Sequence, residues 1–406
     1  MKYTYNKCQA SYSSMKVLMI SDVYFPRING VSTSIESFRH ALSNLDVDVH
    51  VLAPHYPAPH PPDDRVIRVP SQRVPFDPED RLMHRGPLKQ ALQQAVSNNY
   101  DLVHVQTPFA AHYAGLKFAR SQRLPCVATY HTHFEEYLYN YVPIVPKGML
   151  RSMARQLAQR QCNALDAVIV PSRAMEDTLT AYGVTAPMHR VPTGIPVAHF
   201  RRPASVDFSN AFRLRHGIPS DAPMALFVGR AAHEKNIGFL LDAMPHALQD
   251  CPKLVMTIAG EGPALPALKR QAERLGIGEQ VFFLGYLDRQ TELTECYAAA
   301  DIFAFASRTE TQGLVLLEAM AAGLPVLAFA YLGTREIVEP QRGALPAPQT
   351  VEAFGQALAS LANDPVRRQQ MAAEAIAFAD EWTTDACAQR MATVYHSLTS
   401  KSADLA

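Results

Sequence analysis

Residues 302–328 read IFAFASRTETQGLVLLEAMAAGLPVLA. The stretch begins with a short apolar run, Ile302–Phe305, that is typical of a buried strand. A polar loop follows it, then an apolar helical segment that begins near Gly313, and then a second buried strand, Pro325–Ala328. A strand, a helix and a strand in succession form the unit from which parallel sheets are built.

The same alternation runs through nearly the whole chain. Amphipathic helical segments are expected near 31–44, 109–121, 147–163 and 172–181. The other strand-like runs are Val17–Ile20, Val49–Leu52, Leu102–Val105, Val127–Thr129, Val168–Val170, Ala225–Val228, Leu254–Ile258 and Val281–Phe283. We therefore predict an α/β fold with two doubly wound, Rossmann-like parallel-sheet domains that face each other across a cleft. In such domains ligands bind beyond the carboxyl ends of the strands.

The alternation pauses at 191–196, VPTGIP, which lacks periodicity and is rich in proline and glycine. We predict an interdomain linker there. The predicted N-terminal domain spans 1–195, and the predicted C-terminal domain spans 196–382. A helix at about 383–400 is expected to pack back on the first domain.

The composition is that of a folded, soluble protein, with 48% hydrophobic and 19% charged residues. Lysine and arginine outnumber aspartate and glutamate by 20 to 15 up to His199, and the order reverses to 18 against 23 afterwards. A basic half suits an anionic ligand or surface, although compositional scatter explains the difference equally well. The six cysteines show no CxxC spacing, so buried thiols are expected. Without a signal-peptide pattern or a run of about 20 apolar residues, we expect a cytoplasmic protein, with peripheral membrane contact left open.

Two carboxylates stand eight residues apart in the quoted stretch. Glu310 falls in the loop and Glu318 in the helix, so each can hold a different hydroxylated part of one ligand. Gly313 allows a ligand to approach the backbone, and the helix start offers N–H groups to an anion. A capped helix with a surface glutamate and a packing glycine is the alternative interpretation.

Two cations follow another strand, in FVGRAAHEKN at 227–236. The strand ends at Gly229, and Arg230 and Lys235 come directly after it. Paired cations stabilise the negative charge that a diphosphate leaving group develops. A solvated loop with unrelated charges is the alternative.

Two further turns at strand ends carry polar residues. Asn29 and Gly30 lie in a turn that leads from a strand into a helix and can present N–H groups to a phosphate, although an ordinary tight turn has the same sequence. Asp22 precedes that turn. His131 and His133 alternate along an extended stretch and so point in opposite directions, which disfavours a shared metal site. A hydrogen-bonded structural histidine is the alternative for His131.

Asp46 and Asp48 form an Asp-x-Asp pattern that can bind a divalent ion. Here they precede the run Val49–Leu52, where a helix-to-strand turn is expected, so solvated turn carboxylates are favoured. We predict no metal and no cofactor.

The Glu310-x7-Glu318 spacing resembles the signature of family 4 glycosyltransferases, which are retaining enzymes of the GT-B fold. The similarity extends from Met15 to about Trp382 and includes the G-R-x4-K-N motif at 229–236. It implies that Glu310 contacts the donor sugar and Glu318 the nucleotide ribose. It also implies a pyrophosphate clamp of Arg230 and Lys235, with His131 near the donor sugar. The remaining implied positions are Gly30, Gly229, Gly313, Leu314 and Val315 on the donor phosphates, and Asp22, Asn29, His133 and Tyr137 on the acceptor.

The segment 147–163 is basic and amphipathic. Lys147, Arg151 and Arg155 are spaced by four residues, with Arg160 nearby, and tyrosines precede them. Such a helix can lie in a membrane interface, and Arg81, Arg85 and Lys89 add a second basic group. An ordinary helix with its apolar face in the core is the alternative. The apolar stripe consists of Leu150, Met153, Ala154, Leu157 and Ala158.

Three stretches, YHTHFEEY at 130–137, TGI at 193–195 and TETQG at 309–313, are most similar to the diacylglycerol glucosyltransferase branch. The resemblance implies transfer of glucose from UDP-glucose to diacylglycerol at the cytoplasmic membrane face. Pro196 departs from the branch, where an acidic residue is usual. Related branches use GDP-mannose, or soluble, polysaccharide or other glycolipid acceptors, and these stay open. A GT-B epimerase, a phosphorylase and a non-catalytic sugar-nucleotide binding protein are the alternatives from other classes.

Overall fold

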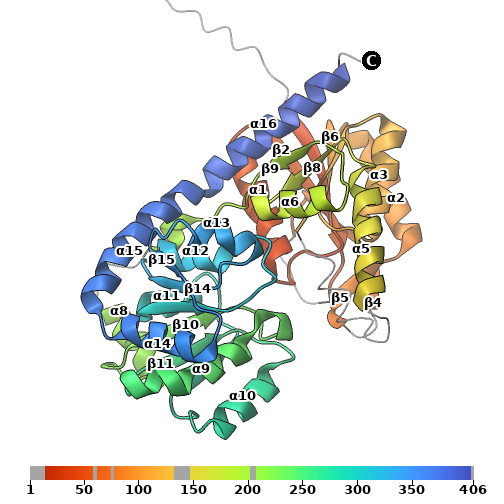
Figure 1. Cartoon of the computed structure of the whole chain (residues 1–406). Coiled ribbons are helices and arrows are strands. Elements are labelled where there is room, and N and C mark those ends of the chain that lie inside the picture. The colour runs from red at the N-terminus through yellow and green to blue at the C-terminus, as the bar shows by residue number, and fades with distance from the viewer. Residues whose placement is uncertain (1–13, 58–61, 75–76, 132–146, 202–206, 404–406) are drawn as a thin grey trace, which may run out of the picture. The chain divides into compact units, whose positions relative to one another are not determined.

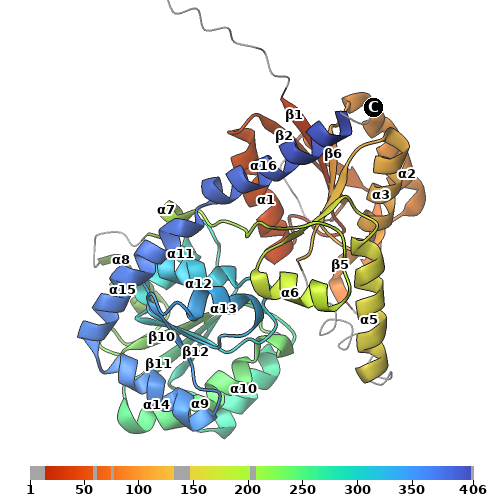
Figure 2. The same cartoon turned by 45° about the horizontal axis from the view of Figure 1, so that its top comes forward.

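The structure is a computed structural model that describes residues 14–57, 62–74, 77–131, 147–201 and 207–403. The chain divides into two compact units. The first unit consists of Met1–Ala128 and Met391–Ala406, and the second consists of Thr129–Arg390. Two parallel sheets with helices packed on them form the architecture (Figures 1 and 2).

The first sheet has seven strands in the order β3-β2-β1-β6-β7-β8-β9. The central strand β1 pairs in parallel with β2 on one side and β6 on the other. The strands are β1 (Met15–Ile20), β2 (Val47–Pro54), β3 (Val66–Val69), β6 (Leu102–Val105), β7 (Cys126–Thr129), β8 (Ala167–Val170) and β9 (Met188–Arg190). A separate antiparallel hairpin joins β4 (Ser71–Val74) to β5 (Asp77–Met83).

The second sheet repeats this topology with six strands, in the order β12-β11-β10-β13-β14-β15. Its strands are β10 (Met224–Val228), β11 (Val255–Ala259), β12 (Val281–Gly285), β13 (Ile302–Phe305), β14 (Val326–Ala328) and β15 (Ala344–Pro346). In both sheets the strand order reverses beside the first strand in the sequence, which is where doubly wound folds bind their ligands.

Helices connect the strands. Those that precede β10 are α1 (Gly30–Ser43), α2 (Arg85–Ala95), α3 (Ala110–Gln122), α5 (Lys147–Cys162), α6 (Arg173–Ala181), α7 (Val197–Phe200) and α8 (Asp207–Arg215), with the short helix η1 (Val96–Asn98). Those that follow it are α9 (Ile237–Asp250), α10 (Leu265–Arg274), α11 (Glu292–Ala299), α12 (Leu314–Ala321), α13 (Arg335–Val338), α14 (Val351–Ala362), α15 (Pro365–Ala379) and α16 (Thr384–Ala403). Three more short helices are η2 (His233–Lys235), η3 (Leu332–Thr334) and η4 (Asp380–Trp382).

The second sheet is stabilised by apolar strands that are buried between two layers of helices. Every residue of β10, β11 and β13 is buried, as expected for parallel strands covered on both faces. Helices α9 and α14 lie on one side of the sheet and α11 and α12 on the other (Figure 1). Phe239 on α9 contacts Phe354 on α14, and both rings contact Phe329, so aromatic packing joins these helices to the strand end.

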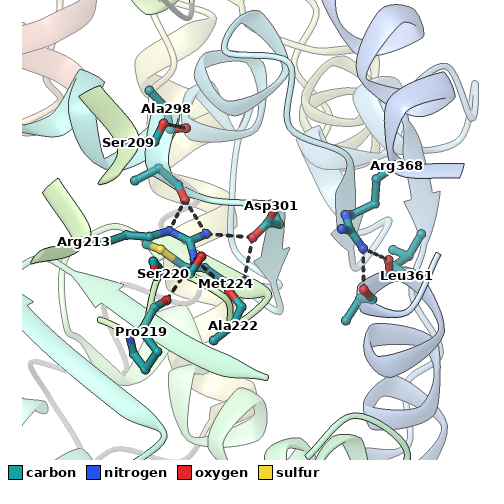
Figure 3. Close-up of polar contacts among 12 residues, drawn as sticks. Ser209, Arg213, Pro219, Ser220, Ala222, Met224, Ala298, Asp301, Leu361 and Arg368 are labelled. Atoms are coloured by element: carbon teal, nitrogen blue, oxygen red, sulfur yellow. Dashed lines mark hydrogen bonds and ion pairs between the residues drawn. The ribbon is translucent and has the colours of Figure 1, made fainter. Parts of the chain in front are cut away.

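A buried arginine fixes the opposite, amino-terminal edge of the same sheet. The guanidinium of Arg213 donates hydrogen bonds to the backbone oxygens of Ala299 and Ala222 and pairs with Asp301 at 2.9 Å (Figure 3). Asp301 also accepts a hydrogen bond from the backbone N–H of Met224, where β10 begins. Arg213 therefore connects the starts of β10 and β13, away from the carboxyl ends where ligands bind.

The predicted fold class is confirmed by the two parallel sheets, and each strand-like run overlaps a strand, although the runs that begin at Leu254 and Pro325 start one residue too early. The sequence pattern missed β3, β4, β5, β9 and β15, which lack an alternating or continuous apolar pattern of sufficient length. The expected turn at Asp46–Asp48 is wrong in one respect. Strand β2 begins at Val47, and Asp48 forms an ion pair with Arg65 at 3.1 Å and a hydrogen bond with the ring of His50 at 3.3 Å rather than standing solvated in a turn.

The C-terminal helix α16 is attached to the first sheet within the first unit. Tyr395 on α16 and His104 on β6 are both fully buried, and the tyrosine hydroxyl lies 2.6 Å from Nδ1 of the histidine. The domain boundaries at 195 and 382 stay a prediction.

Two expectations from composition can be compared with the described ranges. Cys126, Cys162, Cys251, Cys296 and Cys387 are buried free thiols. None of the helices in these ranges combines the length and the apolar composition that a bilayer-spanning segment needs.

Candidate functional site

The loops that follow β10 and β13 meet at the carboxyl ends of these neighbouring strands. Asn236, at the end of the first loop, adopts a left-handed backbone with φ 54°, which asparagine tolerates better than most residues. Its side-chain amide donates a 3.1 Å hydrogen bond to the carbonyl of Ala306, just beyond β13. Gly229 begins the loop, and its N–H donates to the carbonyl of Ala259 at the end of β11. The backbone thus brings Arg230 and Lys235 to the loop that carries Glu310.

Lys235 and Glu310 are in direct contact. The lysine Nζ lies 2.5 Å from the glutamate Oε1, and both side chains are mostly buried. Ser307 donates a hydrogen bond of 2.9 Å to the same carboxylate oxygen. The second cation of one sequence motif and the first carboxylate of the other therefore form an ion pair. Ser307 had no sequence signal of its own, because a serine after a strand is common.

Arg230 is placed differently from Lys235. Its guanidinium lies 3.6 Å from Glu234, one helical turn later, and the side chain is partly exposed. Its predicted role on the pyrophosphate stays a prediction.

Helix α12 begins directly after Gly313. Gly313 adopts φ 93°, a conformation that L side chains rarely adopt, which accounts for the glycine at this position. The first helical residues are Leu314 and Val315, whose N–H groups have no intrahelical acceptor by helix geometry. The start of α12, four residues after Glu310, therefore suits an anionic group.

Glu318 lies in the second turn of α12 and is only 2% exposed. One carboxylate oxygen contacts Arg289 at 2.5 Å, and the other accepts a hydrogen bond of 2.9 Å from the hydroxyl of Tyr297. The carboxylate raises the pKa of Arg289. Arg289 and Tyr297 were missed by the sequence analysis, because nothing in their local pattern links the loop after β12 to a helix 29 residues later.

His131 lies directly after β7, at the edge of the described range. Burial lowers the pKa of its imidazole to about 4, so the ring is neutral at physiological pH. Its backbone carbonyl accepts a 2.9 Å hydrogen bond from the hydroxyl of Thr311, next to Glu310. The second unit therefore places His131 beside the loop that carries Glu310. His133 and Tyr137 lie outside the described residues.

The other predicted residues belong to the first unit. Asp22 is 8% exposed, and its carboxylate accepts hydrogen bonds from the hydroxyl of Thr107 and the N–H of Ala111, at the start of α3. Burial raises the pKa of Asp22 to about 6. Asn29 caps α1 by accepting a 2.9 Å hydrogen bond from the N–H of Ser32. No atom beyond its chain neighbours and own helix lies within 4 Å of where a Cβ of Gly30 would stand.

The predicted apolar stripe on helix α5 is wrong in part. Ala154 and Ala158 are buried, whereas Met153 and Leu157 are exposed by 58% and 41%. The two larger residues therefore do not belong to the core, because they lie on a different face of the helix from the alanines. Arg155 stacks on the ring of Tyr182 at 5.4 Å from the ring centroid. The side chains of Lys147 and Arg151 lie outside the described part of the chain, and Arg160 is exposed.

The chain is similar in sequence to known protein families along most of its length. Residues 209–378 match the family described as "Glycosyl transferases group 1", and residues 28–199 match "Glycosyltransferase Family 4". The chain is 36% identical over 321 residues to an alpha-monoglucosyldiacylglycerol synthase of Streptococcus pneumoniae, covering 77% of this chain and 71% of that protein. This chain belongs to the family 4 glycosyltransferases.

Two further similarities describe the range of the family. The transferase is 29% identical over 342 residues to a GDP-mannose-dependent alpha-mannosyltransferase of Mycobacterium tuberculosis, covering 82% of this chain and 84% of that one. The crystal structure of Anabaena Alr3699/HepE in complex with UDP-glucose is similar in fold, with a TM-score of 0.74 and 20% identity, and covers 95% of this chain and all of that one. The transferase therefore has the GT-B fold and glycosyltransferase activity.

The charges at the strand ends suit this class of reaction. Lys235 offers a cation, the start of α12 offers N–H groups, and Glu310 and Glu318 offer carboxylate oxygens that can accept hydrogen bonds. These groups come from segments that follow neighbouring strands of one sheet. A sugar joined to a diphosphate needs this combination of cationic and anionic partners.

Proposed function

We propose that this transferase moves glucose from UDP-glucose to a lipid hydroxyl, such as that of diacylglycerol, with retention of the anomeric configuration. The main support is the contact between Lys235 and Glu310, because it places a cation that can bind the phosphates beside a carboxylate that can bind the sugar. Similarity to the alpha-monoglucosyldiacylglycerol synthase of Streptococcus pneumoniae supports glucose and diacylglycerol. The UDP-glucose complex of a protein with the same fold supports the donor.

The proposed reaction separates charge at the diphosphate. Arg230 and Lys235 stabilise the departing pyrophosphate, and the N–H groups of Gly313, Leu314 and Val315 contribute at the start of α12. The acceptor hydroxyl attacks the face that the leaving group vacates, and the departing phosphate oxygen takes its proton. Two protein cations balance the diphosphate, so we propose that no resident metal takes part. Glu310 and neutral His131 hydrogen-bond the sugar, and Glu318 exchanges Arg289 or Tyr297 for the ribose hydroxyls.

A membrane surface is the proposed location of the acceptor. Helix α5 contains no acidic residue and carries Lys147, Arg151, Arg155 and Arg160. Met149 is exposed together with Met153 and Leu157, and their spacing of four residues places them in one line along the helix. An exposed apolar line beside cations suits an anionic membrane interface, where the protein would act from the cytoplasmic side.

Incubation with radiolabelled donors tests the proposed reaction. Wild-type protein receives UDP-glucose or GDP-mannose with vesicles that contain diacylglycerol, and label in the lipid phase is measured. Label from UDP-glucose alone, and its loss in Lys235→Ala, is the expected result. Label from GDP-mannose alone would instead favour mannosyl transfer, to which the Mycobacterium tuberculosis relative gives specific support.

Vesicle co-sedimentation tests the membrane surface separately. Replacement of Met149, Met153 and Leu157 by serine should abolish binding to vesicles of anionic lipid. High salt should weaken wild-type binding, because the cations are screened. Leu214→Ser is the matched control, since Leu214 is a leucine on α8 that is 84% exposed and lies outside this line. Equal binding of the triple variant and the wild type would contradict the assignment.

A further inference from the structure

The two residues that follow Glu310 contact three separate segments of the second unit. The hydroxyl of Thr311 donates to the carbonyl of His131 at 2.9 Å, and the hydroxyl of Ser172 donates to the carbonyl of Thr311 at 2.8 Å. The side-chain amide of Gln312 donates to the carbonyl of Thr193 at 2.7 Å and accepts from the N–H of Thr193 at 2.8 Å. Thr311 is therefore held through its hydroxyl and its backbone carbonyl, and Gln312 is held through the nitrogen and the oxygen of its side-chain amide.

The three partners share one position in the fold. His131 follows β7, Ser172 follows β8 and Thr193 follows β9, and these strands are neighbours in the first sheet. Thr311 and Gln312 follow β13 of the second sheet. The contacts therefore join carboxyl ends of strands from both sheets, which is the edge where ligands of such folds bind.

A fourth segment, at Gly333, also contacts this loop. The N–H of Gly333 donates to the carbonyl of Glu310 at 2.9 Å. A Cβ atom at position 333 would lie 2.0 Å from the carbonyl oxygen of Thr311, so only glycine fits. Ser307 holds the Glu310 carboxylate itself. The segment 310–312 thus has contacts with four separate segments, and the orientation of the Glu310 side chain depends on them.

Gln312 carries the strongest of these contacts. It is 5% exposed, and its side-chain amide pairs with both the backbone N–H and the backbone carbonyl of Thr193. An apolar side chain of similar size would remove both hydrogen bonds to Thr193, which would displace the loop. Thr311 offers a cleaner comparison, because valine has its shape without the hydroxyl and serine keeps the hydroxyl.

We propose that Thr311 and Gln312 are positioning residues for Glu310. They hold the Glu310 carboxylate where the donor sugar lies, and they do so by anchoring its loop to the ends of β7, β8 and β9. The inference rests on the proposed function in that Glu310 contacts the donor sugar. Glu318, which contacts the nucleotide in the proposed function, is held by Arg289 and Tyr297 and not by these anchors. Loss of the anchors should therefore weaken binding of the sugar more than binding of the nucleotide.

The test compares Thr311→Val, Thr311→Ser and Gln312→Met with wild type. Affinities for UDP and for UDP-glucose are measured by calorimetry, sugar transfer by label, and folding by thermal unfolding. We expect Thr311→Val and Gln312→Met to lower turnover at least tenfold and to lose the additional affinity for UDP-glucose over UDP. Their affinity for UDP should stay within twofold of wild type, and Thr311→Ser should retain most of the activity. Thr180→Val, on an exposed turn of α6, is the control.

Three results would overturn the inference. These are unchanged turnover in both variants, a parallel loss of UDP affinity that indicates a general structural defect, or equal impairment in Thr311→Ser and Thr311→Val. The failure of the proposed function looks different. A wild type that neither binds nor turns over UDP-glucose counts against the donor, and the same comparison with GDP and GDP-mannose then decides the positioning role.

Discussion

The charge pair between Lys235 and Glu310 offers a direct test of how the donor binds. Their side chains are 24% and 16% exposed and their charged atoms lie 2.5 Å apart. Without ligand, the carboxylate balances the ammonium group. A bound diphosphate must share Lys235 with Glu310, so the carboxylate should weaken binding of a nucleotide that carries no sugar. Glu310→Gln removes this competing charge and keeps the shape of the side chain.

The size of the effect follows from burial. At an effective dielectric constant of about 20, unit charges 4 Å apart attract by about 4 kcal/mol. Partial exposure and solvation reduce the net attraction between Lys235 and Glu310 toward that of surface ion pairs, so we take the net attraction as about 1 kcal/mol. This corresponds to about fivefold tighter binding of UDP by Glu310→Gln, since about 1.4 kcal/mol is a factor of ten. Sugar transfer should fall roughly 100-fold, because a group that stabilises the transition state is lost.

Calorimetry with UDP should be carried out on wild type, Glu310→Gln, Lys235→Ala and the double variant, and turnover measured alongside. Glu339→Gln is the matched control, because Glu339 forms an exposed pair with Arg335 at 2.7 Å. The tighter binding should disappear when Lys235 is already alanine. If Glu310→Gln binds UDP no more tightly than wild type, or if the gain persists without Lys235, the reasoning fails.

Three further predictions concern stability. Arg213→Met should lower the free energy of unfolding by about 3–5 kcal/mol in urea denaturation, because Asp301 and several carbonyls lose their buried partner; Arg215→Met, at an exposed pair, should cost less than about 1 kcal/mol. Leu332 adopts φ 48°, so Leu332→Val should cost about 1–2 kcal/mol while Leu332→Asn is near neutral, and equal losses would contradict this explanation. Asp22 has a pKa of about 6 when folded and 3.8 as its ordinary value, so the folded state binds the proton more tightly. Wild-type stability relative to Asp22→Asn should therefore fall by up to about 3 kcal/mol as pH rises from 4 to 7, and a constant difference would rule out the raised pKa.

The strands at the centre of each sheet could be predicted from the sequence because strands buried on both faces consist mainly of apolar residues. The run Ile302–Phe305 is apolar throughout and matches its strand residue for residue. The edge strands β3 and β9 have no such run, because one side of an edge strand need not be apolar. The left-handed turn at Asp46 likewise depends on where β2 begins, and one turn residue does not reveal that boundary.

The candidate site was only partly readable for a different reason. Glu310 and Lys235 belong to local motifs, and the parallel order of β10 and β13 brings those motifs together. The partners of Glu318 come from a loop and a helix that carry no motif, and the partners of Thr311 and Gln312 come from the other sheet. Such contacts join residues 21 to 180 positions apart, and no local pattern encodes them.

The amino-acid sequence by itself determined the alternation of strands and helices, the family and the residue types that meet a sugar diphosphate, because periodicity and short motifs act over a few residues. Only the tertiary structure decided which charges are paired, which face of α5 is exposed and which backbone groups hold the Glu310 loop. These depend on strand order and on packing between distant segments, where a hydrogen bond needs its two atoms within about 3 Å.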